Sequence, residues 1–390
     1  MRDIRLLILA QFLTAFADNA VLFIAVGMVR DTPQAGWYVP ALQASFLIAY
    51  VVLAAWVGPF SDSRSKTTVL IGANLIKASG VGLMFAGVEP LIAYAVVGIG
   101  GAAYSPAKYG ILPELVDSTR LMKLNAWVEG STIAAILTGG LVGGMLVDRS
   151  VSMALLVVLG LYGASALVAR LMCPLPAVAA WPTGALRRFG ATLRELARDH
   201  EARYALIGSG LFWSSAAVLR VIVVAWAPVV LGLASMQDIA ELTLWSALGI
   251  GIGSMLAPRL IPLAALSRTR FAAYLMAWAI LLLAIVDHVW AARLALLLAG
   301  VAGGVFVVPV NAVLQAIGHR GVGSGDDNDR ANAGAVVAVQ RFVENAMMLL
   351  ATGGYAGLAA LGVKPVPALF GLCVLLAAGV FLLNRARRSG

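Results

Sequence analysis

Long uninterrupted runs of apolar residues dominate this sequence. A run of about twenty such residues is long enough to cross a hydrocarbon core of about 30 Å as an α-helix. The chain is 61% hydrophobic and 12% charged, whereas soluble domains have about 45–50% apolar and about 25% charged residues. A water-soluble fold is therefore excluded. The runs lack the alternation, in segments of about ten residues, that a membrane β-barrel requires. The sequence thus predicts an all-α integral membrane protein.

Charges, prolines and glycines divide the apolar runs into twelve predicted transmembrane helices. They cover residues 4–29, 37–60, 69–87, 90–116, 123–147, 151–172, 204–232, 238–257, 271–286, 291–316, 331–360 and 364–384. The first run is longer than a signal-peptide core and has no small-residue cleavage site, so we expect it to be retained as a span.

Basic residues are distributed unequally between the segments that connect these helices. If the N-terminus lies in the cytoplasm, the inside segments hold twenty Lys and Arg residues, and the outside segments hold four: Arg30, Arg149, Arg293 and Lys364. This positive-inside bias predicts that both termini are cytoplasmic. The basic side chains lie singly or in short clusters between the spans. The net charge of +9 is therefore explained by membrane topology, and no nucleic-acid partner is expected.

The longest polar stretch lies near the middle of the chain. We predict that it is a linker bounded by prolines and followed by a basic amphipathic helix. The apolar face of this helix consists of Leu186, Phe189, Leu193 and Leu196. The stretch separates six predicted spans from six. We therefore predict an N-terminal six-helix bundle over residues 1–172, a cytoplasmic linker over residues 173–203 and a C-terminal six-helix bundle over residues 204–390.

An internal repeat supports this division. Two motifs of the first half recur in the second: Gly100-Gly101 with Pro106 recurs as Gly303-Gly304 with Pro309, and Val128-Glu129 recurs as Val343-Glu344. Six plus six helices with a cytoplasmic linker resemble the arrangement of the major facilitator superfamily, in which substrate binds between the halves near the membrane midplane.

Seven ionisable residues fall within the predicted spans: Asp18, Lys77, Lys108, Glu129, Arg220, Arg341 and Glu344. Each costs at least about 2.5–3.5 kcal/mol at a helix centre, so each should face the protein interior and be paired or hydrated. For any one of these residues, a structural ion pair and a functional charge are about equally plausible interpretations. A structural ion pair is the favoured interpretation for Lys108 with Glu129. Arg341 and Glu344 are one helical turn apart and could pair with each other.

Asp18 and Arg220 lie near the middle of the first and seventh spans, which are equivalent helices of the two halves. A function in a cavity is favoured for both, and Asp18 is the expected nearest counter-charge of Arg220. A guanidinium fits a phosphate in bidentate fashion and a carboxylate can take an ammonium group, so the two suit a zwitterionic phosphate headgroup. For each uncharged polar residue in the same set of helices, interhelical hydrogen bonding is as plausible as a role in the cavity. These residues are Asn19, Asn311, Gln315, Gln340 and Asn345.

The segment GPFSDSRSK follows the second predicted span. Gly58, Asp62 and Lys66 match the loop signature between the second and third spans of the major facilitator superfamily, although Ser63 and Ser65 replace its usual basic residue and glycine. Together with Arg64, this segment would latch the inward gate.

Signals of catalysis are missing. His200, His288 and His319 have no Asp five positions later, and the sequence contains no GxSxG, Walker or HExxH motif. Cys173 and Cys373 provide no disulfide framework and no metal-ligand spacing. We expect no enzyme activity, no catalytic or metal site and no cofactor. Any active transport would have to run on an ion gradient.

Six segments resemble the bacterial lysophospholipid transporter family of the major facilitator superfamily: AQFLTAFADNAVLF (10–23), AAYSPAKYGILPEL (102–115), EGSTIAAIL (129–137), LFWSSAAVLR (211–220), VFVVPVNAVLQ (305–315) and QRFVENAMMLL (340–350). The most specific is YSPAKYG, which generic drug or sugar transporters of the superfamily do not carry. The resemblance implies an inner-membrane flippase that moves lysophosphatidylethanolamine and related lysolipids from the outer to the inner leaflet for reacylation, by alternating access without ATP.

The resemblance also has implications for partners and site residues. Reacylation would need an acyltransferase/acyl-ACP synthetase, expected to be a separate protein because the chain ends at Gly390 without such a domain. A monomer among membrane lipids is expected. The acidic loop 324–330 is not part of the family pattern. The residues placed where they would shape the cavity are Asp18, Asn19, Lys108, Tyr109, Glu129, Arg220, Asn311, Gln315 and Glu344.

Two other functions stay open. In a proton-coupled major facilitator transporter of a water-soluble small molecule, Asp18 or Glu344 would protonate in each cycle. A membrane scaffold for the acyltransferase would transport nothing.

Overall fold

The computed structural model of this chain describes residues 2–29, 35–115, 118–173, 177, 184–261, 268–320 and 329–388. Within these ranges the regular secondary structure is helical, without strands. By their internal contacts the residues form two compact units, Met1–Ala185 with Ser235–Ala240, and Leu186–Ala234 with Glu241–Gly390.

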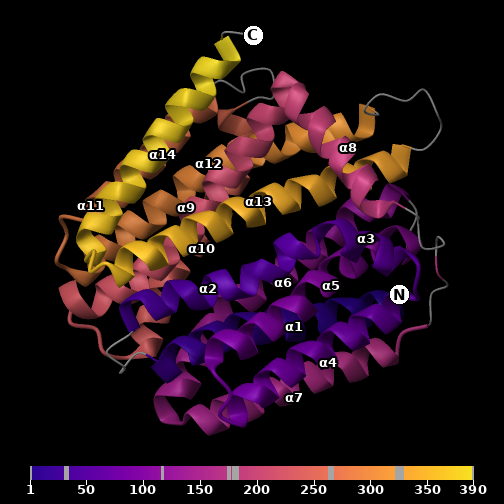
Figure 1. The fold of residues 1–390 in the computed structure, drawn as a ribbon, viewed down its shortest axis with the longest axis horizontal. Coiled ribbons are helices and arrows are strands. Elements are labelled where there is room, and N and C mark those ends of the chain that lie inside the picture. Colours follow the sequence, from indigo (N-terminus) through magenta and orange to yellow (C-terminus); the bar gives the residue numbers. More distant parts are fainter. Residues whose placement is uncertain are drawn as a thin grey trace. The chain divides into compact units, whose positions relative to one another are not determined.

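The first unit contains seven helices that run side by side (Figure 1). They are α1 (Arg2–Val29), α2 (Ala35–Val52), α3 (Ala54–Asp62), α4 (Lys66–Phe85), α5 (Pro90–Leu115), α6 (Ser118–Arg149) and α7 (Val151–Arg170). Helix α1 packs on α6 and α7, α4 packs on α5 and α7, and α2 packs on α5. Glycines allow the close approach of α6 to α1: a Cβ at Gly143 would lie 2.6 Å from Ala20 Cα.

The remaining helices are α8 (Ala185–Arg198), α9 (His200–Val230), α10 (Met236–Leu260), α11 (Thr269–Leu283), α12 (Val289–Arg320), α13 (Asp329–Ala360) and α14 (Pro365–Arg388). Helix α9 packs on α12, α13 and α14. A Cβ at Gly249 or Gly253 of α10 would collide with the backbone of α12, and one at Gly300 or Gly304 of α12 would collide with the backbone of α10. Small residues spaced by four thus bring these two helices into backbone contact, as is common between membrane helices.

The first turn of α10 belongs to the first unit because the end of α6 caps it. Asp148 Oδ2 accepts a hydrogen bond from Ser235 Oγ at 2.9 Å and another from the backbone N–H of Gln237 at 3.0 Å. Such a carboxylate satisfies backbone donors that a helix N-terminus leaves unpaired.

Ten helices of the described chain are long and apolar enough to cross a membrane. Helices α2 and α3 form a further candidate span that is bent by 60°, and α11 is a shorter apolar helix of 15 residues. These twelve segments match the predicted spans one for one, which confirms the predicted all-α membrane fold. The bend near Leu53 was not predicted from the sequence, because no proline or glycine marks it.

Helix α8 occupies the second part of the predicted linker. Leu196 is fully buried, and the Phe189 ring meets that of Phe342 on α13 edge to face, with 5.4 Å between the ring centroids. Leu186 is exposed. The arginines of the opposite face are all exposed: Arg187, Arg194 and Arg198.

Candidate functional site

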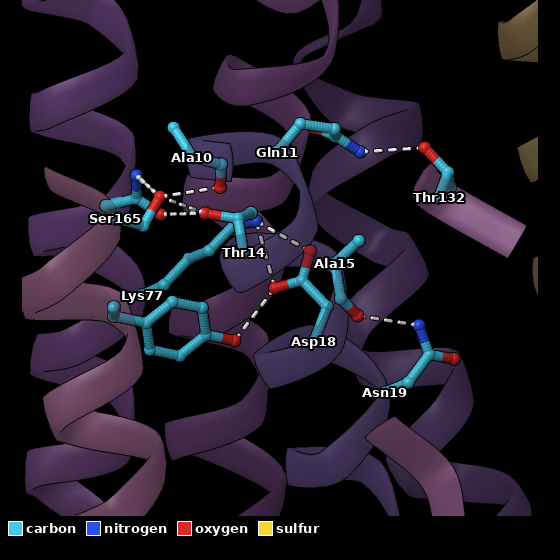
Figure 2. A network of polar contacts seen from close by, with 11 residues as sticks. Ala10, Gln11, Thr14, Ala15, Asp18, Asn19, Lys77, Thr132 and Ser165 are labelled. Atoms are coloured by element: carbon cyan, nitrogen blue, oxygen red, sulfur yellow. Dashed lines mark hydrogen bonds and ion pairs between the residues drawn. The ribbon is translucent and has the colours of Figure 1, made fainter. Parts of the chain in front are cut away.

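A carboxylate near the middle of α1 is the first candidate site (Figure 2). Asp18 accepts hydrogen bonds from Lys77 Nζ of α4, at 2.9 Å to Oδ1 and 2.7 Å to Oδ2, and from the Tyr162 hydroxyl of α7, at 2.8 Å to Oδ1. The Lys77 side chain is 1% exposed and that of Asp18 is 25% exposed. The carboxylate is therefore the accessible end of this ion pair and the ammonium group is its buried end.

Lys77 is the counter-charge of Asp18. Lys77 binds both carboxylate oxygens, a pairing that the sequence did not predict. That Asp18 is the nearest counter-charge of Arg220 stays a prediction. A lysine inside a membrane protein is costly unless it is paired. The rings of Tyr104 and Tyr162, whose centroids lie 4.8 Å and 5.8 Å from Nζ, add cation–π stabilisation.

A neutral polar network lies next to this pair and ties α1 to α4 and α7 (Figure 2). The Thr14 hydroxyl bonds Asn74 Oδ1 at 2.6 Å and Ser165 Oγ at 2.8 Å, and Ser165 donates to the carbonyl of Ala10 at 2.8 Å. All three polar side chains are buried. Because buried polar groups with partners fix the relative positions of their helices, this network holds the part of α1 that precedes Asp18.

Three other predicted residues of the first unit have local contacts. Asn19 Nδ2 donates to the carbonyl of Ala15 at 2.9 Å, one turn back on its own helix. Lys108 is buried, and its Nζ lies 4.3 Å from the centroid of the neighbouring Tyr109 ring. These contacts are compatible with a structural role as well as with a cavity role.

The second unit contains a buried carboxylate of its own, on α13. Glu344 Oε1 accepts from the Ser209 hydroxyl and, at 2.8 Å, from Gln340 Nε2, while Oε2 accepts from Arg341 Nη1 at 3.1 Å. Asn311 Oδ1 accepts from Ser209 Oγ at 3.1 Å and from Gln340 Nε2 at 3.0 Å. The predicted pairing of Arg341 with Glu344 is confirmed. Ser209 of α9 completes the cluster.

Asn345 lies beside this cluster on α13 but bonds elsewhere. Its Nδ2 donates to the carbonyl of Arg341 at 2.7 Å, again one turn back on the same helix. Asn19 and Asn345 thus behave alike, and these bonds are not interhelical.

Arg220 lines a small cavity inside the second unit. The walls come from α9, α10, α11 and α12 and are mostly apolar, with Phe212, Leu219, Ile250, Met276 and Leu296 among them. Thr243 and Ser246 are the other polar side chains of this lining. The cavity therefore combines one permanent positive charge with two hydroxyl-bearing side chains and mostly apolar walls.

The residues expected at the gate surround the turn between α3 and α4. Lys66 Nζ lies 3.6 Å from Asp62 Oδ1, and the Lys66 side chain is buried whereas that of Asp62 is exposed. The Arg64 guanidinium lies 5.9 Å from the centroid of the Phe60 ring. A Cβ at Gly58 would meet no atom within 4 Å.

Some predicted residues lie outside the described part of the structure. They are the side chains of Glu129 and Gln315, and residues 324–328 of the acidic loop. The proposed pairing of Lys108 with Glu129 falls there too. Among the described residues, no three His, Cys, Asp or Glu side chains are placed to hold a metal ion.

Solved structures show the fold. A crystal structure of the nucleoside transporter NupG superposes with a TM-score of 0.72, at 14% identity, over 100% of this chain and 99% of that one. A crystal structure of a POT family transporter in complex with 5-aminolevulinic acid gives a TM-score of 0.75, at 13% identity, over 100% and 96% of the two chains.

Sequence comparisons show the family. The family model of the Major Facilitator Superfamily matches residues 7–352. The lysophospholipid transporter LplT of Klebsiella pneumoniae subsp. pneumoniae is 42% identical over 364 residues, which are 92% of this chain and 89% of that protein. The LplT protein of Photorhabdus laumondii is 37% identical, over 100% and 97% of the two chains. The chain described here therefore belongs to the major facilitator superfamily and, within it, to the family of the LplT lysophospholipid transporters.

Proposed function

We propose that this protein is a lysophospholipid flippase of the bacterial inner membrane. It moves lysophosphatidylethanolamine and related lysolipids from the outer to the inner leaflet by alternating access, with both of its own termini in the cytoplasm. The observation that carries the proposal is the similarity, at 37–42% identity and over nearly the whole chain, to proteins named as lysophospholipid transporters. The positive-inside bias supports the orientation.

The two charged sites suit the two charges of a zwitterionic headgroup. In the first unit, the partly exposed carboxylate of Asp18 suits the ammonium group, and in the second unit Arg220 suits the phosphate. A single acyl chain remains in apolar surroundings while the headgroup passes through the protein.

Transport uses neither ATP nor an ion gradient. Asp18 and Glu344 are each bound by a basic side chain, Lys77 and Arg341. Both carboxylates thus already have a basic partner within their own unit of the fold. A reaction that consumes the flipped lysolipid in the cytoplasm sustains net flow by mass action. That reaction is reacylation by a separate acyltransferase, and the transporter itself acts as a monomer without enzyme activity.

The turn between α3 and α4 acts as the inward gate. Lys66 and Asp62 face each other across it. Their contact would form and break as the transporter changes state, with Arg64 and Gly58 beside it.

Spheroplasts test the proposed function in its cellular setting. Lysophosphatidylethanolamine with a labelled glycerol backbone is added outside, and labelled diacyl lipid is measured with time in cells that express the chain and in cells that lack any such transporter. Expression of the wild-type chain should increase conversion several-fold, and an Arg220→Ala chain made in equal amount should not. Equal conversion in all three strains would contradict the proposal.

A further inference from the structure

We propose that Lys77 sets how this transporter discriminates lysolipids by headgroup charge. It does so by cancelling the charge of Asp18 and by fixing the orientation of its carboxylate. This inference rests on the proposed function, in which Asp18 meets the headgroup. Lys77 is 1% exposed, so it acts through Asp18 and is a positioning residue.

The hydrogen bonds of Asp18 leave one oxygen less occupied than the other. Oδ1 accepts from both Lys77 and Tyr162, whereas Oδ2 accepts from Lys77 alone. A carboxylate oxygen can accept two hydrogen bonds. Oδ2 therefore keeps one acceptor position, and a headgroup ammonium or hydroxyl can donate to it without displacing Lys77.

The surroundings of Lys77 hold its ammonium group in place. A Cβ at Gly100 of α5 would lie 2.6 Å from Lys77 Cγ and 2.5 Å from the carbonyl oxygen of Ala73, so only glycine leaves room for the lysine stem. The Tyr104 ring lies 4.8 Å from Nζ. Two bonds from Nζ then reach the two oxygens of Asp18. Gly100, the first glycine of the repeated Gly100-Gly101 motif, thus leaves the space in which the Lys77 side chain lies.

The pair is electrically neutral as a whole, and this neutrality determines its selectivity. A lysolipid with an ethanolamine headgroup has no net charge, and one with a glycerol headgroup has a net charge of about −1. A neutral pair discriminates weakly between them. The two lipids differ in charge only by the ammonium group of ethanolamine. Even at about 10 Å from this ammonium, and at an effective dielectric constant of about 20, one uncompensated charge would change their relative affinity on the order of tenfold.

Removal of either charge should therefore shift the preference, in opposite directions. Lys77→Met leaves the charge of Asp18 uncompensated, which repels the anionic lipid. Asp18→Asn leaves the charge of Lys77 uncompensated, which attracts it. A residue that merely stabilised the fold would change transport of both lipids by the same factor.

The test uses the purified full chain in vesicles that contain both lysolipids in equal amounts. The readout is the ratio of ethanolamine to glycerol lysolipid flipped, which does not depend on the amount of active protein. We expect Lys77→Met to raise the ratio about tenfold, Asp18→Asn to lower it about tenfold, and the double variant to return it to within about twofold of wild type. Tyr162→Phe is the matched control, because it removes one hydrogen bond to Oδ1 and no charge; it should leave the ratio unchanged.

Other outcomes separate this inference from the proposed function. If both single variants leave the ratio within about twofold of wild type, or shift it in the same direction, Lys77 has no such role, whereas the flippase function stands. If the wild-type chain flips neither lipid, the proposed function itself fails. Should Lys77→Met not reach the membrane, the comparison of Asp18→Asn with the double variant isolates the same lysine charge, and an unchanged ratio there would refute the inference.

Discussion

Arg341 and Glu344 form an ion pair across one turn of α13, with 3.1 Å between Nη1 and Oε2, and the two side chains differ sharply in exposure. Glu344 is 3% exposed and Arg341 is 48% exposed. The carboxylate is also the shared acceptor of Ser209 and Gln340. It thus joins α9 to α13 from a buried position, while its cation reaches the surface of the unit.

Glu344→Ala should destabilise the protein by about 2 kcal/mol, because three hydrogen bonds to its carboxylate are lost and the buried Ser209 and Gln340 keep only Asn311 as an acceptor. Glu344→Gln should cost less, since its amide oxygen can still accept from Ser209 or Gln340. Thermal unfolding of the purified protein in detergent measures both. Glu195→Ala, at an exposed position of α8, is the control and should change stability by less than about 0.5 kcal/mol. A Glu344→Ala protein as stable as this control would refute the buried-acceptor role.

Gly100→Ala should destabilise the first unit by about 1–3 kcal/mol, since the added Cβ would press on Ala73 and on the stem of Lys77. Gly82→Ala in α4 is the matched control: a Cβ there meets nothing within 4 Å, so the change should be neutral or stabilising by up to about 1 kcal/mol. Thermal unfolding separates the two variants. Equal midpoints would show that the α4–α5 approach tolerates a methyl group.

Arg220→Ala should lower apparent lysolipid affinity at least about tenfold, because a charged hydrogen bond to phosphate is worth about 1.5–3 kcal/mol. Arg220→Lys should retain part of the affinity, since the charge remains and the bidentate geometry is lost. Binding is measured by the concentration dependence of flipping or by tryptophan fluorescence. Arg259→Ala, at an exposed position of α10, should bind like wild type. An Arg220→Ala protein with unchanged affinity would remove Arg220 from the site.

Single cysteines should report the orientation of the chain after the native Cys173 and Cys373 have been replaced. A cysteine at exposed position 364, between α13 and α14, should react with an impermeant thiol reagent added outside intact spheroplasts. One at exposed position 194, in α8, should react only after the membrane is opened. The reverse pattern would overturn the assignment of both termini to the cytoplasm.

The spans could be predicted from the sequence and the pairing of their charges could not. Hydrophobic runs and their interruptions place a membrane helix whatever its neighbours are, so the twelve segments were expected close to where they lie. The bend between α2 and α3 was missed because no proline or glycine marks it. Arg341 and Glu344 could be paired because they share one helix. Lys77 lies 59 positions from Asp18, and helical periodicity alone does not determine which faces of α1 and α4 meet.

The hydroxyl partners were also missed. Ser209 and Tyr162 lie in apolar runs where single polar residues are common and cheap, and nothing in their local sequence distinguishes them. Only the fold shows that each donates to a buried or half-buried carboxylate.

Lysolipid flipping should be measured in vesicles that contain only the purified protein, without ATP and with a protonophore present. Labelled lysophosphatidylethanolamine is placed in the outer leaflet, and the fraction protected from extraction by albumin is followed with time. We expect rapid protection in vesicles with the wild-type chain, unaffected by the protonophore, and slow protection in protein-free vesicles. Protection no faster than in protein-free vesicles, or protection that depends on an imposed pH gradient, would contradict the proposed function.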